Sequence, residues 1–360
     1  MNSSLLEKSV KVLLLVFLSF VLLFYGKPFL VPFLLASLLA MLVLPLCAKL
    51  ERKMNKVLAV SISLFLLLTV ISIIIYIIAW QVTDISDKGP EIQKNITEKI
   101  DQVRTFATNS LGISKQQQEK IIQQQQKNTE GKISGMMTSL FTSFGGFLTD
   151  FLIVLVYIFL FLLFRAHLQK FVLMLVPKRE QNNAQTIMHD VRRVSQKYLT
   201  GLALMISCLW VMYGIGFTIV GVENAIFFAI LCGLLEIVPF VGNLTGVAIT
   251  LLMTLAQGGS SGMLIGILIT YSVVQFTQSY ILEPMIVGRE ISINPVFTIM
   301  GIVGGELLWG IAGMILALPL LGIIKIICDH IEPLKPFGYL IGDEKKRSEK
   351  SGGKLKKLFG

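Results

Sequence analysis

The stretch Gly233-Leu-Leu-Glu-Ile-Val-Pro-Phe-Val-Gly-Asn-Leu-Thr-Gly246 decides how this chain folds, and it lies inside a longer apolar segment, residues 225–256. It places a carboxylate (Glu236), a proline (Pro239) and an amide (Asn243) where an unbroken apolar helix is otherwise expected. A charge at the centre of a bilayer costs at least about 2.5 kcal/mol, and proline clashes with the preceding helical turn. Irregular backbone survives at membrane depth only where protein covers it or where it lines a wet cavity. We therefore predict a broken intramembrane element beside a pathway for solute or ions.

The composition of the chain is that of a membrane protein. Of its 360 residues 54% are hydrophobic and 15% are charged, whereas soluble domains carry about 25% charged residues. Mean hydropathy is +0.74, and several apolar runs approach or exceed the roughly 20 residues that cross a bilayer as a helix. We predict an all-α, polytopic helical membrane protein with about six full spans, two broken or re-entrant helical hairpins and an external helical hairpin.

Basic residues set the expected orientation. Lys49, Arg52, Lys53 and Lys56 crowd a short loop that holds one acid, Glu51. Positive loops collect on the cytoplasmic side, so this loop and both chain termini are expected inside. The net charge of +10 is concentrated in loops and in the C-terminal tail, which we interpret as solvated and able to touch anionic lipid. Such tails are common, so nucleic-acid binding is not expected.

The chain divides into five expected regions. They are an N-terminal three-helix membrane region (1–83), an external helical polar region (84–142), a fourth span with a cytoplasmic amphipathic helix (143–199), a C-terminal membrane transport core (200–330) and a basic cytoplasmic tail (331–360). Isoleucines in the external region recur near every 3.5 residues, as on one helical seam. The seam suggests packing on itself or on neighbouring subunits, and hence a homo-oligomer.

Two further features complete the survey of the chain. The stretch 178–200 is basic and amphipathic, which predicts a helix lying in the membrane interface. The four cysteines lie in or beside apolar runs, without metal-ligand or disulfide spacing. We therefore expect neither a metal site nor a cofactor.

A second apolar segment, residues 296–327, repeats the pattern of the first. Its middle holds an acid, Glu306, among glycines, and Pro319 follows. Two apolar segments interrupted by glycine or proline are the best sequence indication of a transporter binding site. The residues expected to form helix breaks or hinges are Pro239, Gly242, Gly246, Gly304, Gly305, Gly310 and Gly313.

Each broken segment has two open interpretations. It is either a re-entrant hairpin or one long kinked span. A length of about 30 residues and the central glycines favour hairpins, which would place Arg289 on the cytoplasmic side. Between the two segments, Tyr271, Gln275 and Gln278 are spaced by four and three residues, so they share one helix face. A polar stripe on an apolar helix normally faces protein or water rather than lipid.

The C-terminal half resembles the autoinducer-2 exporter family of bacterial membrane proteins. The resemblance lies in Glu236-Ile-Val-Pro239-Phe-Val-Gly242, in Gln275 with Glu283-Pro284, Gly288 and Pro295, and in Gly304-Gly305 through Gly310, Gly313 and Pro319. It covers most of the chain and least of all the external region. It implies a secondary transporter of the bacterial inner membrane, oligomeric, that exports autoinducer-2 or other small solutes. Some members of that family are described as sodium/proton antiporters.

Four kinds of function are weighed against these residues. In a secondary transporter, Glu236 and Glu306 would carry protons or a cation, while Asn243 and Gln275 would meet the solute. No Walker A pattern occurs, so an ion gradient or the solute's own gradient would drive it. The plainer interpretation is a protonated acid bonded to free backbone at each break, with the glycines serving close packing.

The other three kinds of function compete with a transporter to different degrees. A passive oligomeric channel and a scaffold that recruits a partner through the external hairpin stay open. An intramembrane enzyme is disfavoured, because the apolar runs hold no paired aspartates, no His-Glu-x-x-His and no Ser/His pair.

Overall fold

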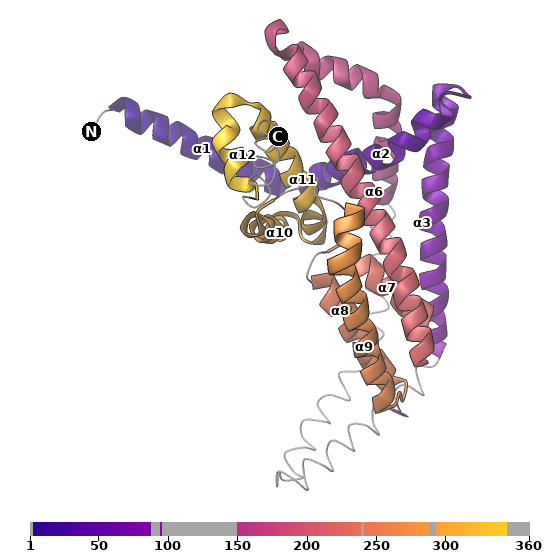
Figure 1. Ribbon diagram of the computed structural model, residues 1–360. Helices are drawn as coiled ribbons and strands as arrows, with labels where there is room; N and C mark the ends of the chain where they lie inside the picture. The colour runs from indigo at the N-terminus through magenta and orange to yellow at the C-terminus, as the bar shows by residue number, and fades with distance from the viewer. Residues whose placement is uncertain (1–2, 88–93, 96–149, 239–240, 288–292, 344–360) are drawn as a thin grey trace, which may run out of the picture. The chain divides into compact units, whose positions relative to one another are not determined.

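The computed structural model describes residues 3–87, 94–95, 150–238, 241–287 and 293–343, and these residues form helices joined by short turns (Figure 1). The chain forms two compact units. The first comprises Met1–Leu68, Val154–Met205 and Ser279–Gly360, and the second comprises Thr69–Ile153 and Ile206–Gln278. The five regions expected from the sequence stay a prediction.

The N-terminal half is built from long helices. They are α1 (Ser3–Tyr25), α2 (Lys27–Leu50), α3 (Lys56–Asp87), an unlabelled helix at Asp150–Met174 and, after a 3-10 turn at Lys178–Glu180, α6 (Gln181–Val220). Pro28 occupies the first turn of α2, where its missing N–H has no intrahelical partner to lose. The external region 84–142 lies outside the described residues except for the end of α3 and residues 94–95.

The C-terminal half contains shorter helices. They are α7 (Ala225–Leu235), α8 (Val241–Ala256), α9 (Ser261–Thr277), a π-helical stretch (Gln278–Val287), α10 (Pro295–Trp309), α11 (Ile311–His330), a 3-10 turn (Glu332–Leu334) and α12 (Lys335–Ile341). The tail beyond residue 343 lies outside the described residues.

Among the residues that the structure describes, six helices are long and apolar enough to cross a membrane. They are Lys27–Leu50, Lys56–Thr83, Asp150–Met174, Lys178–Val220, Ser261–Ile286 and Ile311–His330. The predicted polytopic helical membrane protein is therefore confirmed. The membership of the set differs from the expected one, because α11 belongs to it while the apolar part of α1, Val10–Tyr25, falls among the shorter helices.

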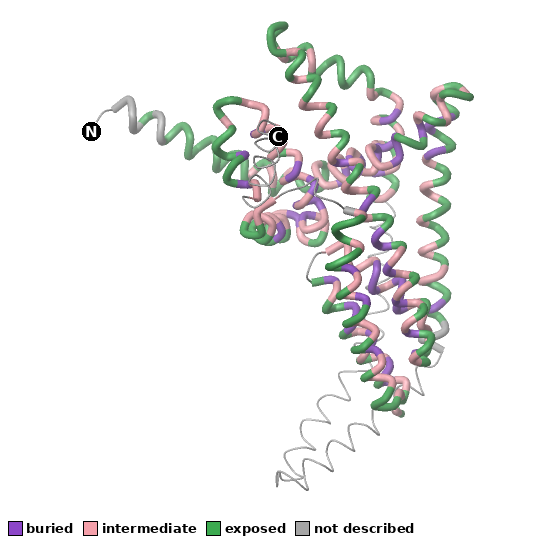
Figure 2. Tube along the Cα trace, viewed as in Figure 1, coloured by how far each residue is buried: buried purple, intermediate pink, exposed green. Residues whose placement is uncertain are grey.

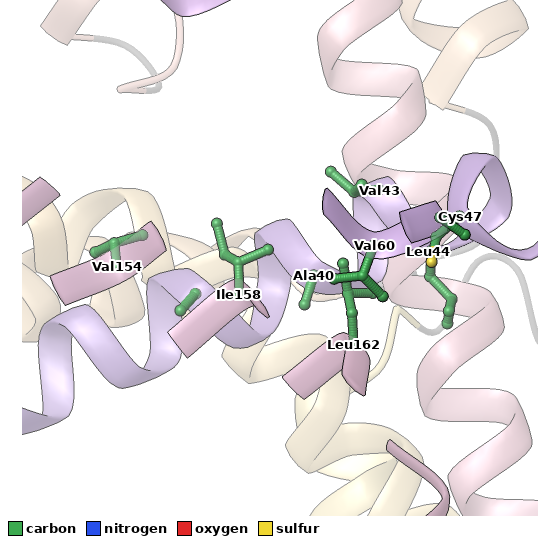
Figure 3. Packing of buried hydrophobic residues seen from close by; sticks show 10 residues of the cluster. Ala40, Val43, Leu44, Cys47, Val60, Val154, Ile158 and Leu162 are labelled. Carbon is green, nitrogen blue, oxygen red and sulfur yellow. The ribbon is translucent and has the colours of Figure 1, made fainter. Parts of the chain in front are cut away.

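In the first unit, α2 packs against the start of α3 and against the helix Asp150–Met174 (Figure 3). Small side chains at Ala36, Ala40, Cys47 and Ala59 are buried at this contact, together with Ile158. Small residues let helix backbones approach closely, which drives helix association where no hydrophobic effect acts between helices. A second cluster joins Leu38 of α2 with Trp309 and Leu316 of the α10–α11 pair.

Many residues of the helices are exposed (Figure 2), and a large number of these exposed residues are apolar. Leu13 and Phe17 of α1 and Phe65 and Tyr76 of α3 are more than half exposed. Soluble monomers rarely expose large contiguous apolar patches. Contact with lipid tails or with other membrane-embedded protein accounts for this exposure.

The structure corrects one expectation about the stretch 178–200. It forms, from Gln181 on, a single helix of 40 residues with the apolar residues that follow, so it is not a separate helix, and its expected place in the membrane interface stays a prediction. A helix of this length measures about 60 Å, whereas the hydrocarbon core of a bilayer is about 30 Å thick. The 40 residues of α6 are therefore more than one crossing of the membrane core requires.

Candidate functional site

The broken segment 225–256 folds into two short helices, α7 and α8, which pack against one another in the second unit (Figure 1). The contact depends on glycine. A Cβ atom at Gly246 would lie 3.1 Å from the Cα of Cys232, and one at Gly242 would overlap the carbonyl of Leu235. The segment is thus a helical hairpin rather than one kinked helix, as expected. Pro239 lies outside the described residues, between the two helices.

Glu236 lies at the C-terminus of α7, directly after the last helical residue. This is an unfavourable place for an anion, because the carbonyl end of a helix carries partial negative charge. The half-buried carboxylate is compensated by Gln278, whose Nε2 donates a hydrogen bond of 2.6 Å to Glu236 Oε1. Gln278 follows α9 directly and its side chain is buried, with 6% of the residue exposed.

A second amide contact runs beside the first. Asn243, in the first turn of α8, donates a hydrogen bond from Nδ2 to Oε1 of Gln275. Gln275 and Gln278 lie three residues apart on one face of α9 and its extension, so the two contacts join the same helix face to both arms of the hairpin. We call Glu236, Asn243, Gln275 and Gln278 the polar cluster.

The polar cluster contains two buried acceptor oxygens without a partner. Oε1 of Gln278 and Oδ1 of Asn243 are inaccessible to solvent and accept no hydrogen bond from the residues that the structure describes. A buried polar atom left unpaired costs about 1–3 kcal/mol. The cluster therefore suits an electropositive group, which would satisfy both oxygens.

The segment 296–327 also folds into a hairpin, formed by α10 and α11 in the first unit. Its turn is at Gly310, whose φ of 68° and ψ of −144° are available to glycine alone. Gly305 and Gly313 face one another so closely that a Cβ on either would overlap the backbone of the other. A Cβ at Gly304 would meet nothing within 4 Å, so no close contact requires a glycine there.

The structure brings together three of the four residues predicted to line the pathway. Glu236, Asn243 and Gln275 join in the polar cluster, whereas Glu306 belongs to the first unit, where its side chain is exposed on α10. Its role stays a prediction, as does the orientation of Arg289, which lies outside the described residues. Gln278 was not among the predicted site residues, although its spacing from Gln275 had already placed it on the polar face.

Other ionisable side chains do not assemble a metal site in the part of the chain that the structure describes. No group of three or more His, Cys, Asp or Glu side chains is positioned to hold an ion there.

Outside the membrane core, burial works to raise the pKa of the Glu51 carboxyl, but the hydrogen bond and charge of Arg165 outweigh it and lower that pKa.

The long apolar helices, the two glycine-built hairpins and the half-buried acid among amides together define a polytopic membrane protein of the transporter class. The family model "AI-2E family transporter" matches residues 12–332, and the chain belongs to that family. The chain is 29% identical over 163 residues to "Putative transport protein YrrI" of Bacillus subtilis (strain 168), covering 45% of this chain and 46% of that protein. It is 23% identical over 296 residues to "Putative transport protein YhhT" of Escherichia coli (strain K12), covering 82% of each.

The chain aligns with less than half the length of several of these relatives, including a "Putative transport protein" of Borreliella burgdorferi, of which it covers 41% at 28% identity. The family is one of membrane transporters, and its members' names carry no substrate. The predicted family resemblance is confirmed.

Proposed function

We propose that the chain is a secondary transporter of the bacterial cytoplasmic membrane, which exports a small solute such as an autoinducer-2-like signal. An ion gradient, or the solute's own gradient, supplies the driving force. In this proposal the protein is a homo-oligomer in contact with lipid, both termini are cytoplasmic, and the chain performs no catalysis. The observation that carries the proposal is the Glu236 carboxylate, held at a helix C-terminus by the buried amide of Gln278.

Glu236 has the properties required of a coupling group. Its charge costs free energy at the end of α7, so a proton or a bound cation relieves a real penalty there. Ionisable residues within membrane helices are rare and mark ion or proton pathways. Asn243 and Gln275 lie beside it and offer hydrogen-bonding groups to a polar solute. The hairpin glycines Gly242 and Gly246 keep α7 and α8 close together around these groups.

Sodium/proton antiport by the same site is the second candidate. It is favoured by the two unpartnered oxygens of Gln278 and Asn243, because carbonyl and carboxylate oxygens are the ligands that hard cations prefer. A passive oligomeric channel is the third candidate. Its flux would follow the solute gradient alone and would not respond to proton or sodium gradients.

The test is flux in proteoliposomes that contain the purified full chain. Loaded solute and internal pH are followed together, under imposed proton and sodium gradients. Glu236→Gln keeps the shape of the side chain and removes its charge, whereas Glu223→Gln makes the same change at an exposed position of the same unit. We expect Glu236→Gln to abolish or uncouple flux and Glu223→Gln to leave it intact.

Two outcomes would contradict the proposal. Fully coupled transport by the Glu236→Gln protein would remove this carboxylate from the mechanism. Long-lived single-channel currents, unaffected by either ion gradient, would replace the transporter with a channel. Glu306→Gln, measured in the same vesicles, tests whether the second acid takes part.

A further inference from the structure

The amide of Gln278 has a fixed orientation for as long as Glu236 is ionised. A carboxylate only accepts hydrogen bonds, so the donor atom Nε2 must face Glu236 Oε1, at 2.6 Å. The acceptor atom Oε1 is then turned to the other side of the amide plane. There it is buried and has no partner among the described residues. The ionised acid thus leaves an oxygen in need of a donor or a cation.

A proton on Glu236 removes the reason for this orientation. The carboxyl group then carries an O–H donor. Rotation of the Gln278 amide by half a turn exchanges its nitrogen and oxygen, which occupy nearly equal volumes, and lets Oε1 accept that O–H. The buried oxygen then has its partner, while Nε2 gives up its own acceptor and turns to the side that Oε1 faced, so that side presents a donor, which disfavours a cation, in place of an acceptor. No helix has to move for this exchange.

We propose that the Gln278 amide is the specificity-determining element of the site, because its Oε1 binds either the proton on Glu236 or an electropositive group of the occupant, never both. This inference rests on the proposed function, since it concerns the same polar cluster. The occupant's electropositive group is a small monovalent cation or an ammonium. Oδ1 of Asn243, the other unpartnered oxygen of the cluster, contributes to the same occupant.

Gln257 supplies a matched control within the same unit. Its Nε2 also donates to a side-chain oxygen, that of Asn224 at 3.3 Å, and its Oε1 is also buried without a partner in the described structure. The partner of Gln257 is an amide, which takes up no proton in this pH range. Gln257→Met therefore repeats the chemical change of Gln278→Met without touching a titratable contact.

The experiment is calorimetric titration of the purified full chain with Na⁺, K⁺ and methylammonium, in two buffers of different ionisation enthalpy. The buffer dependence gives the number of protons released per cation bound. For the wild type we expect release of about one proton, with an apparent affinity that rises about tenfold per pH unit in the acidic range. Gln257→Met should behave likewise. Gln278→Met should release close to no protons, with affinity nearly independent of pH.

The three probes separate the two sources of positive charge, because Na⁺ and K⁺ test a metal cation and methylammonium tests an ammonium. Proton release by Gln278→Met equal to that of the wild type would overturn the inference, since Glu236 would then exchange with the cation directly. The absence of proton-linked binding of all three probes to the wild type would overturn it as well. If the Gln278→Met protein does not fold, Gln278→Asn takes its place, because its shorter side chain does not reach Glu236. The number of protons released per cation bound is again measured, and it should again be close to zero. Solute flux in Glu236→Gln vesicles tests the proposed function separately.

Discussion

Gly313 and Gly304 form a matched pair for substitution by alanine in the α10–α11 hairpin. A Cβ atom at Gly313 would overlap the carbonyl of Gly305 and lie 3.1 Å from its Cα, all of which are backbone atoms. A Cβ at Gly304 would meet nothing within 4 Å. Both glycines lie inside helices. The two substitutions therefore share the change in helix propensity and differ in the contact alone.

The expected free energies of unfolding follow from these two contributions. Alanine in place of glycine within a helix stabilises by about 0.5–1 kcal/mol, and Gly304→Ala should gain this amount. An extra methyl group forced into a packed contact costs about 1–3 kcal/mol. Gly313→Ala bears that cost against the same gain, so we expect it to be neutral to destabilised by about 2 kcal/mol. Propensity cancels in the difference between the variants, which should be about 1–3 kcal/mol.

The assay is reversible unfolding in mixed micelles, with helix content followed by circular dichroism for the wild type and both variants. Gly305→Ala is a second probe of the same contact, and its free energy of unfolding should resemble that of Gly313→Ala. Equal stability of Gly304→Ala and Gly313→Ala would show that the two hairpin arms do not approach at these glycines. The close packing of α10 on α11 would then be wrong.

Two further predictions concern contacts in the first unit. The lowered pKa of Glu51 contributes stability that is present above its unfolded value of about 4.3 and is lost as pH falls through the lower folded value. We therefore expect the Arg165→Met protein to lose less stability on acidification than the wild type does. The free energy of chemical unfolding, compared at neutral pH and at a pH of about 3, measures this difference. Trp309 donates a hydrogen bond of 2.9 Å from Nε1 to the carbonyl of Leu23. Trp309→Phe should cost about 1–3 kcal/mol and speed amide exchange at the end of α1, as hydrogen-exchange mass spectrometry would detect; unchanged exchange there would contradict the contact.

The sequence was sufficient to predict where the apolar segments break and which polar residues share a helix face. Glu236 interrupts a strongly apolar run, so the prediction of a break at that place needed only local information. The spacing of Gln275 and Gln278 likewise fixed their common face, because the helical period is a local property. Their contact with Asn243 and Glu236 on one hairpin was not predicted.

The partner of each amide could not be predicted in the same way. Gln278, and not Gln275, meets Glu236, because the register of α9 against the hairpin is set by packing between segments distant in sequence. The different packing of Gly304 and Gly313 could not be predicted for the same reason. Whether a glycine is required at a position depends on the residue that faces it across the hairpin, which is distant in sequence. The continuity of α6 was missed because a change from polar to apolar residues was interpreted as a helix boundary.

The two hairpins use the same backbone device with different chemistry. In α7–α8, Gly246 lies against Cys232, and in α10–α11, Gly313 lies against Gly305, so both pairs of helices approach through glycine. The first hairpin holds an acid at the end of a helix, against the helix dipole, with a buried amide partner and two unpartnered oxygens beside it. These features lower stability, so packing alone gives no reason for them. A group that arrives and leaves at the polar cluster would offset their cost, and for that reason the proposed binding role belongs to this hairpin.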